Sequence, residues 1–168
     1  KIFGSVNVHG SKNSALPIIV SSLLSKKTLK LSNVPNVVDV LNLIKLLKNY
    51  GVKIEHKKNK LKINPSKIKN LSADYDVVRK MRASILILGP LLSRFGEARI
   101  SLPGGCAIGT RPIDIHLAGL SKLGANFEIQ NGFVVGSVKS QLIGNKIKLP
   151  FPSVGATENI LMASVLAK

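Results

Sequence analysis

A repeat of about seventy residues constrains the fold of this chain more than any single motif does. Each of three copies carries an apolar segment with helical periodicity and little polar surface, which predicts a helix buried on most sides. The three segments are Ser14–Ser25, Ala83–Arg94 and Glu158–Lys168. Because one unit cannot bury such a helix alone, we expect the three helices to pack together at the centre of the fold. Pro17 is expected in a first helical turn, and Pro90 is expected to kink its helix.

An amphipathic helix is predicted twice, each time ending at a glycine. The segments are Asp39–Gly51 and Asp114–Gly124, and alignment of their terminal glycines superposes apolar residues that share one helical face. The superposed residues are Ile44, Leu47 and Tyr50 in the first copy and Leu117, Leu120 and Leu123 in the second. Gly51 and Gly124 fit the left-handed position that closes a helix.

A β-hairpin is predicted after each amphipathic helix. The first turns at Lys58 and Asn59 within Val52–Asn64, and the second turns at Asn131 and Gly132 within Ala125–Val135. Asn-Gly is the stronger turn signal of the two. Short strands are expected ahead of the helices, at Val6–Val8, Leu29–Leu31, Arg99–Leu102 and Lys146–Leu149.

The third copy of the unit reaches only its buried helix, so its second strand, amphipathic helix and hairpin are missing. We therefore predict an α+β fold of pseudo-threefold repeated strand-helix-strand-helix-hairpin units, truncated in the third unit. The unfinished unit is expected to expose apolar surface. The residues expected on this surface are Ile160, Leu161, Val165 and Leu166.

The charge of the chain, +17 at pH 7, raises the question of a nucleic-acid partner. Most of the 25 basic residues are lysines spread along the chain, and with 4% aromatic residues and no Trp there is little for bases to stack on. The composition favours an anionic small molecule as ligand. A small basic nucleic-acid-binding module and an inactive remnant remain the alternatives.

Membrane, disulfide and metal sites find no support in the sequence. No stretch approaches the roughly twenty apolar residues of a membrane-spanning helix, and the first residues do not have the pattern of a secretory signal. We expect a cytoplasmic protein. The single cysteine, Cys106, excludes an internal disulfide, and no Cys/His cluster has the spacing of a zinc site.

The loop from Leu102 to His116 combines glycines with reactive side chains. Cys106 lies among glycines and near Arg111, where a thiol could donate a proton or act as a nucleophile; a small buried residue is the alternative. Asp114 is explained equally well as a helix-capping residue. Arg111 has a solvated surface arginine as its alternative, and His116 is more typical of a partly buried helical histidine than of a catalyst.

Three further segments favour contact with an anion. Lys12 and Asn13 begin a buried helix, where backbone amides and an ammonium act together; a surface lysine beside an Asn cap is the alternative. Arg82 has apolar neighbours and should need an anionic partner. Pro152–Thr157 opens the third buried helix with small residues, which suits backbone contact with a phosphate.

These motifs, in their order along the chain, resemble the enolpyruvyl transferase family, in particular its branch that uses UDP-N-acetylglucosamine. The matching motifs are Gly-Ser-Lys12-Asn13-Ser-Ala-Leu-Pro, Met-Arg82-Ala-Ser, Pro-Gly-Gly-Cys106-Ala-Ile-Gly-Thr-Arg111-Pro-Ile-Asp114 and Ser153-Val-Gly-Ala-Thr. The cysteine loop is the most specific of them, since the sister enzyme of the shikimate pathway shares the fold but not this loop. The resemblance implies an inside-out α/β barrel of the enolpyruvyl transferase type.

The resemblance also implies an activity. The family branch transfers enolpyruvyl from phosphoenolpyruvate to the 3-hydroxyl of UDP-N-acetylglucosamine and releases phosphate, the first committed step of peptidoglycan synthesis, with no cofactor or metal. Cys106 would be the catalytic proton donor, and Lys12, Asn13 and Arg111 would bind phosphoenolpyruvate. The residues implied for the nucleotide sugar are Arg82, Arg111, Pro112, Ile113, Asp114, Ile115, Phe151, Pro152, Ser153 and Val154.

Two features of the chain depart from the family. Phe151 stands where the family commonly has a lysine, so one ionic contact to the nucleotide phosphates is lost. The resemblance ends inside the first of two domains: residues 12–168 would be an incomplete first domain, and residues 1–11 a hinge and strand of the second. The family's catalytic aspartate and further arginines lie in the missing second domain, so we expect this chain alone to be inactive.

Overall fold

The repeated unit appears twice in the computed structural model, which describes residues 1–69, 71, 82–102 and 113–168. The first unit contains α1 (Lys12–Ser21), η1 (Ser22–Leu24), β1 (Leu29–Leu31), α2 (Val38–Asn49), β2 (Lys53–Lys57) and β3 (Lys60–Asn64). The second contains η2 (Arg82–Ile87), α4 (Leu88–Phe95), β4 (Glu97–Ser101), α5 (Asp114–Lys122), β5 (Ala125–Gln130) and β6 (Phe133–Val138). The helix α6 (Val154–Ser164) follows them. The predicted α+β repeat is confirmed.

Each unit forms a three-stranded antiparallel sheet of the same topology. The strand orders are β1-β3-β2 and β4-β6-β5, so the last strand of each hairpin lies in the middle of its sheet. On β3, Leu61 and Ile63 are buried while Lys62 between them is exposed, which is the alternation of a sheet with one covered face. Both predicted hairpins are therefore confirmed, together with the strand that precedes each amphipathic helix.

The turns and helix ends have the backbone geometry that their sequence demands. Asn131 and Gly132 have φ of 50° and 77°, the left-handed values that a two-residue hairpin turn needs. Gly51 and Gly124 have φ of 90° and 99°, as expected after a helix. These local predictions held because few other residues can adopt such angles without strain.

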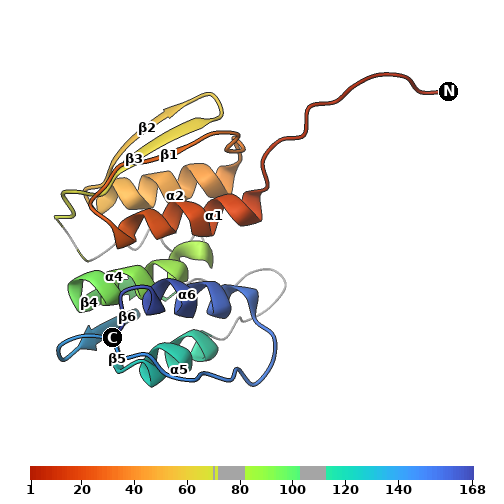
Figure 1. The fold of residues 1–168 in the computed structure, drawn as a ribbon. Coiled ribbons are helices and arrows are strands. Elements are labelled where there is room, and N and C mark those ends of the chain that lie inside the picture. Colours follow the sequence, from red (N-terminus) through yellow and green to blue (C-terminus); the bar gives the residue numbers. More distant parts are fainter. Residues whose placement is uncertain (70, 72–81, 103–112) are drawn as a thin grey trace.

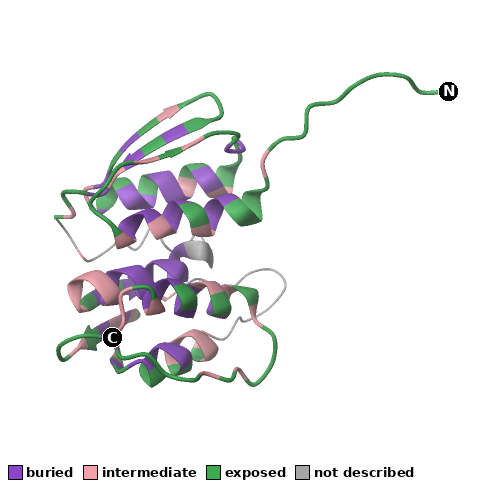
Figure 2. Cartoon of the chain, viewed as in Figure 1, coloured by how far each residue is buried: buried purple, intermediate pink, exposed green. Residues whose placement is uncertain are grey.

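The apolar helices α1, α4 and α6 lie in the middle of the molecule, with the two sheets on the outside (Figure 1). Ile19 of α1, Leu88 and Leu91 of α4, and Ala163 of α6 are completely buried. Figure 2 shows buried residues along the central helices and at intervals on the strands of the first sheet. The predicted central packing of apolar helices is thus confirmed.

The helices α4 and α6 approach each other so closely that a side chain at Gly89 is excluded. A Cβ atom at Gly89 would overlap the backbone oxygen of Asn159 and its Oδ1 atom. The Gly89 amide instead donates a 2.8 Å hydrogen bond to Asn159 Oδ1. Ser93, one turn further along α4, donates to the carbonyl oxygen of Ala163 at 2.9 Å.

A guanidinium group joins the first unit to the second. Arg94 Nη1 donates to the carbonyl oxygens of Leu23 and Ser25 at 2.8 and 3.0 Å, and Nη2 donates to that of Pro65 at 3.2 Å. Burial lowers the pKa of Arg94 from its ordinary value, yet a guanidinium stays charged in proteins. Its charge therefore strengthens the bonds to these three carbonyl groups.

Two predicted strands and the bounds of the third apolar helix are wrong. Val6–Val8 and Lys146–Leu149 are not strands, because neither segment has a neighbouring strand to pair with among the described residues. In the first of them, Val6 and Val8 are almost fully exposed in the extended tail of Figure 1. The third helix is α6, displaced toward the N-terminus from the predicted segment because Ser153 caps it by accepting from the Ala156 amide.

The prolines also differ from expectation. Pro17 lies inside α1, beyond its first turn, whereas Pro90 lies in the first turn of α4. A 3₁₀ helix, η2, runs into α4 just before Pro90, and the expected kink stays a prediction. A proline is tolerated in a first turn because its missing N–H has no partner there.

The predicted apolar surface of the last helix is only partly present. Leu161 and Val165 are 66% and 62% exposed. Ile160, in contrast, is buried at 9% exposure because its side chain packs on Gly119 of α5. Leu166 is half-buried.

Replacing the exposed pair with polar residues tests this surface. The double variant Leu161→Gln, Val165→Thr is expected to bind less of a fluorescent hydrophobic dye, while its free energy of unfolding changes by less than about 0.5 kcal/mol. Ile160→Ala, on the buried side of the same helix, should lose about 2–4 kcal/mol in chemical unfolding. Unchanged dye fluorescence in the double variant would contradict the assignment.

Candidate functional site

The predicted binding residues that the structure describes gather where helices begin. Lys12 and Asn13 begin α1, Asp114 begins α5, and Val154 begins α6. In Figure 1 all three helices start on the right-hand side of the molecule. Helix N-termini carry partial positive charge and free amide groups, so this end of the molecule favours anions.

Three predicted residues fall outside the described part of the chain. Cys106, Arg111 and Pro112 belong to the segment 103–112, which the structure does not describe. Arg82 is described by its backbone alone, at the start of η2. The roles expected of these four residues stay predictions.

Lys12 is held by a carboxylate that the sequence analysis did not single out. Its Nζ atom lies 2.7 Å from Oδ2 of Asp39, a residue in the first turn of α2. Both side chains are partly exposed, 47% for Lys12 and 41% for Asp39, so the pair contributes little to stability and can open. Nothing in the spacing of Lys12 and Asp39 along the chain signals this contact. Lys12 is thus a cation that can exchange Asp39 for an anionic ligand.

The α1 terminus is capped from within the chain. Ser11 accepts a hydrogen bond from the Ser14 amide through its hydroxyl group, at 3.4 Å. Asn13, the expected partner of Lys12, is exposed at this end of α1. The Asn cap that we considered as the alternative explanation of this motif is therefore wrong, because Ser11 is the capping residue.

The start of α6 presents both polar and apolar groups. The Ser153 hydroxyl accepts from the Ala156 amide at 3.4 Å, and Thr157 Oγ1 donates to the Ser153 carbonyl oxygen at 2.8 Å. Phe151 is 55% exposed and Val154 is 77% exposed. Phe151 therefore offers an exposed apolar ring just before α6.

His116, in the first turn of α5, connects this helix to α6. Its Nδ1 atom lies 3.1 Å from Nδ2 of Asn159, and its ring packs against Gly155 in the first turn of α6. Burial lowers the pKa of His116 below its ordinary value of 6.5, because desolvation disfavours the charged ring. The prediction of a partly buried helical histidine agrees with this placement.

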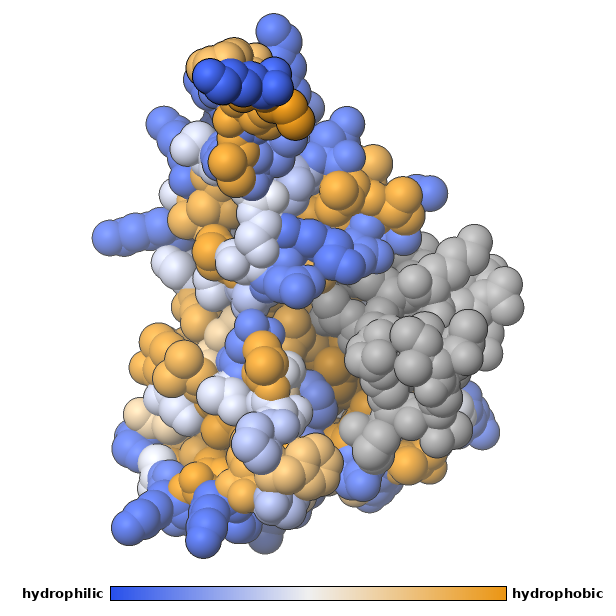
Figure 3. Space-filling model, turned by 90° about the vertical axis from the view of Figure 1, so that its right-hand side faces the viewer, coloured by the Kyte–Doolittle hydropathy of each residue, from blue (hydrophilic) through white to orange (hydrophobic). Residues whose placement is uncertain are grey.

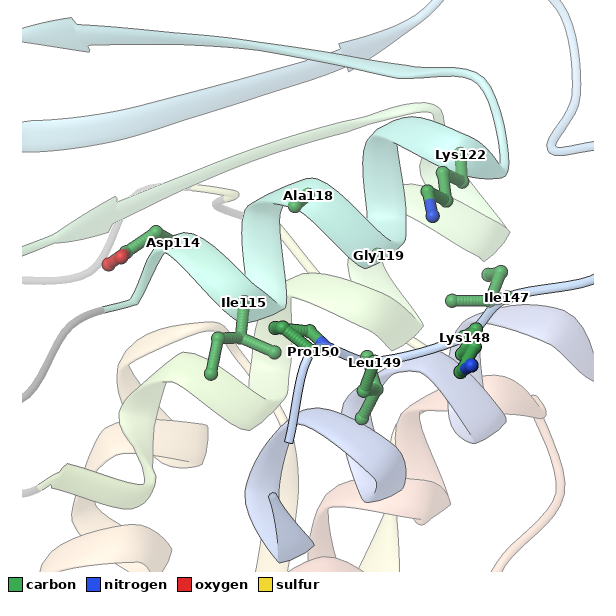
Figure 4. A pocket seen from close by; sticks show the side chains of 9 residues that line it. All are labelled: Asp114, Ile115, Ala118, Gly119, Lys122, Ile147, Lys148, Leu149 and Pro150. Carbon is green, nitrogen blue, oxygen red and sulfur yellow. The ribbon is translucent and has the colours of Figure 1, made fainter. Parts of the chain in front are cut away.

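A pocket of about 200 Å³ lies between α5 and the segment that leads toward α6 (Figure 4). Two predicted residues, Asp114 and Ile115, line it, and the carboxylate of Asp114 points away from the other labelled side chains. The remaining lining residues were not predicted: Ala118, Gly119, Lys122, Ile147, Lys148, Leu149 and Pro150. The two lysines make this pocket suitable for an anionic ligand with an apolar part.

The face on which these helices begin is mixed in character. Figure 3 views the molecule from this end and shows hydrophilic and hydrophobic side chains side by side over its described residues. Such a face fits a small ligand better than an extended polyanion, which binds a contiguous basic surface.

Residues 1–69, 71, 82–102 and 113–168 hold no group of three or more His, Cys, Asp or Glu side chains able to bind a metal ion. Within the same ranges, no helix is both long and apolar enough to span a bilayer.

Comparison with known families places the whole chain in one of them. The family model "EPSP synthase (3-phosphoshikimate 1-carboxyvinyltransferase)" matches residues 1–168. A UDP-N-acetylglucosamine 1-carboxyvinyltransferase of Campylobacter jejuni (strain RM1221) is 53% identical over 165 residues, 98% of this chain and 39% of the relative. One of Pelagibacter ubique (strain HTCC1062) is 51% identical over 168 residues, 100% of this chain and 40% of the relative. The chain thus spans about 40% of the length of these relatives.

Solved structures show the same fold at low sequence identity. The enolpyruvyl transferase NikO from Streptomyces tendae superposes with a TM-score of 0.81 at 18% identity, covering 98% of this chain and 39% of NikO. An EPSP synthase from Acinetobacter baumannii gives a TM-score of 0.79 at 22% identity, covering 98% of this chain and 38% of the EPSP synthase chain. At these identities the likeness establishes the fold alone.

The partly buried imidazole of His116 predicts a loss of stability in mild acid. Because its pKa is lower in the folded chain than in the unfolded chain, the unfolded state binds the proton more tightly. The free energy of unfolding therefore contains a contribution from the neutral His116 ring. This contribution is fully present above pH 6.5 and is lost as the pH drops through the pKa of His116 in the folded chain. Chemical unfolding between pH 7.5 and about pH 5.5, above the carboxylate range, should show this decline.

A matched pair of variants isolates the effect. His116→Gln keeps a side-chain acceptor for Asn159 and should flatten the dependence, whereas His9→Gln, in the exposed tail, should leave it unchanged. An equally steep decline in His116→Gln would assign the effect to another group.

Proposed function

Because this chain belongs to the EPSP synthase family of carboxyvinyltransferases, whose model matches residues 1–168, we propose that it is part of an enzyme that transfers enolpyruvyl to UDP-N-acetylglucosamine. One observation supports this acceptor over the others found in the family. Relatives named for UDP-N-acetylglucosamine are 51–53% identical to the chain. The EPSP synthase and NikO structures are only 18–22% identical.

The proposed reaction is an addition followed by an elimination. The 3-hydroxyl group of UDP-N-acetylglucosamine loses its proton to a base, proposed to lie in the second domain, as its oxygen attacks C2 of phosphoenolpyruvate. At the same time C3 takes up a proton, which gives a tetrahedral intermediate that still carries phosphate. Loss of a proton from C3 and departure of inorganic phosphate from C2 then restore the double bond in the product. Charge develops on the phosphate and carboxylate groups, so cations fixed beside them lower the barrier.

Lys12 and Asn13 are proposed to bind phosphoenolpyruvate at the start of α1. The ammonium group of Lys12 is already placed at the positive end of this helix, paired with the exposed carboxylate of Asp39. A dianionic phosphate would compete well for this ammonium, because backbone amides at the helix end reinforce its charge. Arg111 is proposed as the second cation of the site.

Cys106 is proposed to deliver the proton to C3. Arg111 follows Cys106 by five residues in the sequence, and a cation beside a thiol favours loss of its proton. A thiolate is also a nucleophile, so the proposal predicts a covalent adduct with reactive analogues of phosphoenolpyruvate.

The nucleotide sugar is proposed to bind between the starts of α5 and α6. Arg82, the segment 111–115 and the segment 151–154 supply the contacts. The pocket at Asp114 and Ile115 adjoins this region and carries Lys122 and Lys148, which suits a diphosphate. The exposed ring of Phe151 replaces an ionic contact with an apolar one.

The second domain of the enzyme is proposed to lie outside this chain. Residues 1–9 project away from the helices, with Ile2 and Phe3 almost fully exposed, which fits a strand that pairs with another domain. Residues 12–168 would form most of the first domain. Closure of the two domains would exclude water and bring the remaining catalytic groups to the substrates. A cytoplasmic location and a role in peptidoglycan synthesis, and so in cell shape and division, follow from this proposal.

A joined protein tests the activity. We expect residues 1–168 alone to release no phosphate from phosphoenolpyruvate and UDP-N-acetylglucosamine. When these residues replace the matched 39% of the Campylobacter jejuni relative, phosphate release should appear with that acceptor and not with shikimate 3-phosphate. Cys106→Ser in the joined protein should lower kcat at least about 100-fold. Turnover by residues 1–168 alone would contradict the need for a second domain.

A mass measurement tests the role of Cys106 separately. An epoxide analogue of phosphoenolpyruvate should add to Cys106 of the joined protein, faster when UDP-N-acetylglucosamine is bound. Cys106→Ser should remove the added mass but retain nucleotide-sugar binding, whereas Arg111→Ala should weaken that binding. If the folded joined protein gains no sugar-dependent mass, Cys106 is a structural residue.

A further inference from the structure

Asn159 is a completely buried amide whose polar atoms are all engaged. Its Oδ1 atom accepts from the Gly89 amide at 2.8 Å. Its Nδ2 atom donates to the Ile85 carbonyl oxygen at 2.9 Å and lies 3.1 Å from Nδ1 of His116. The side chain is 0% exposed, so each of these groups would be costly to leave without a partner.

These contacts fix the protonation of the neighbouring imidazole. The Gly89 amide can only donate and the Ile85 carbonyl can only accept, which sets the orientation of the Asn159 amide. Its NH₂ group therefore faces His116 as a donor, and Nδ1 of His116 must accept. His116 is accordingly neutral, with its proton on Nε2.

The same side chain ties together two segments proposed to bind the nucleotide sugar. His116 lies two residues after Asp114 on α5, and its ring packs on Gly155 at the start of α6. Asn159 lies on the next turn of α6. Its side chain also hydrogen-bonds to Ile85 of η2 and to Gly89 of α4. The spacing between the starts of α5 and α6 therefore depends on the contact between Asn159 and His116.

We propose that Asn159 is a positioning residue of the nucleotide-sugar site, which acts by holding His116 as the neutral Nε2–H tautomer against the start of α6. This inference rests on the proposed function for its ligand. Asn159 itself does not touch the sugar or the reacting atoms. An ordinary packing residue would stabilise the fold without setting the tautomer of a histidine.

The first experiment measures the tautomer, which needs no substrate. Long-range ¹H–¹⁵N correlation spectra of residues 1–168 should show His116 with its proton on Nε2. In Asn159→Asp the carboxylate can only accept, so the proton should move to Nδ1. Asn145→Asp is the matched control, because Asn145 Nδ2 also donates to a carbonyl oxygen, that of Lys122, at the surface; it should leave the His116 signals unchanged.

The second experiment measures the consequence for binding in the joined protein. Asn159→Asp should raise the dissociation constant for UDP-N-acetylglucosamine by about tenfold or more, with KM for phosphoenolpyruvate changed much less. His116→Gln, which can accept from Asn159 and donate toward α6, should retain affinity, and His116→Leu should lose it. This second pair decides the matter if Asn159→Asp fails to fold.

Each outcome distinguishes the inference from the proposed function. A proton on Nδ1 in the native chain, or a tautomer unaffected by Asn159→Asp, overturns the inference whatever the ligand is. A changed tautomer with unchanged nucleotide-sugar affinity overturns it too, as does equal affinity of His116→Gln and His116→Leu. If the unmodified joined protein does not bind UDP-N-acetylglucosamine at all, the proposed function fails while the tautomer result stands.

Discussion

The close approach of α4 and α6 is the constraint on which the rest of this structure depends. It is possible only because residue 89 is a glycine, since a Cβ atom there would overlap the backbone of Asn159. The approach brings the Asn159 amide within reach of Gly89, Ile85 and His116, so one buried side chain links η2, α4, α5 and α6. Buried polar groups whose hydrogen bonds are all made in this way favour one arrangement of the helices over alternative arrangements.

The arrangement of the central helices also concentrates positive potential at one end of the molecule. The helices α1, α5 and α6 begin on the same side, so their dipoles add at the surface where the predicted binding residues lie. In the described chain this potential is balanced locally by caps from Ser11 and Ser153 and by the Asp39 carboxylate beside Lys12. An anionic substrate would replace the Asp39 carboxylate beside Lys12, so that binding exchanges one anionic partner of this lysine for another.

Prediction from the sequence succeeded where the signal was local. The Asn131 and Gly132 turn, the glycines that close α2 and α5, and the apolar faces of the central helices all follow from the conformations those residues tolerate. It failed at Val6–Val8 and Lys146–Leu149, where an extended apolar pattern has no strand beside it. It also missed the pairing of Lys12 with Asp39, because no local rule relates two residues brought together by helix packing.

The sequence by itself determined the repeated unit, the class of fold and the binding motifs, because helix and strand periodicity and turn chemistry act over a few residues at a time. Only the tertiary structure decided which side chains meet. It buried Ile160 against Gly119 while leaving Leu161 exposed, and it joined Asn159 to a histidine 43 residues earlier in the chain. These contacts depend on how closely two helices approach, which is set by the packing of the whole core and by no single segment of it.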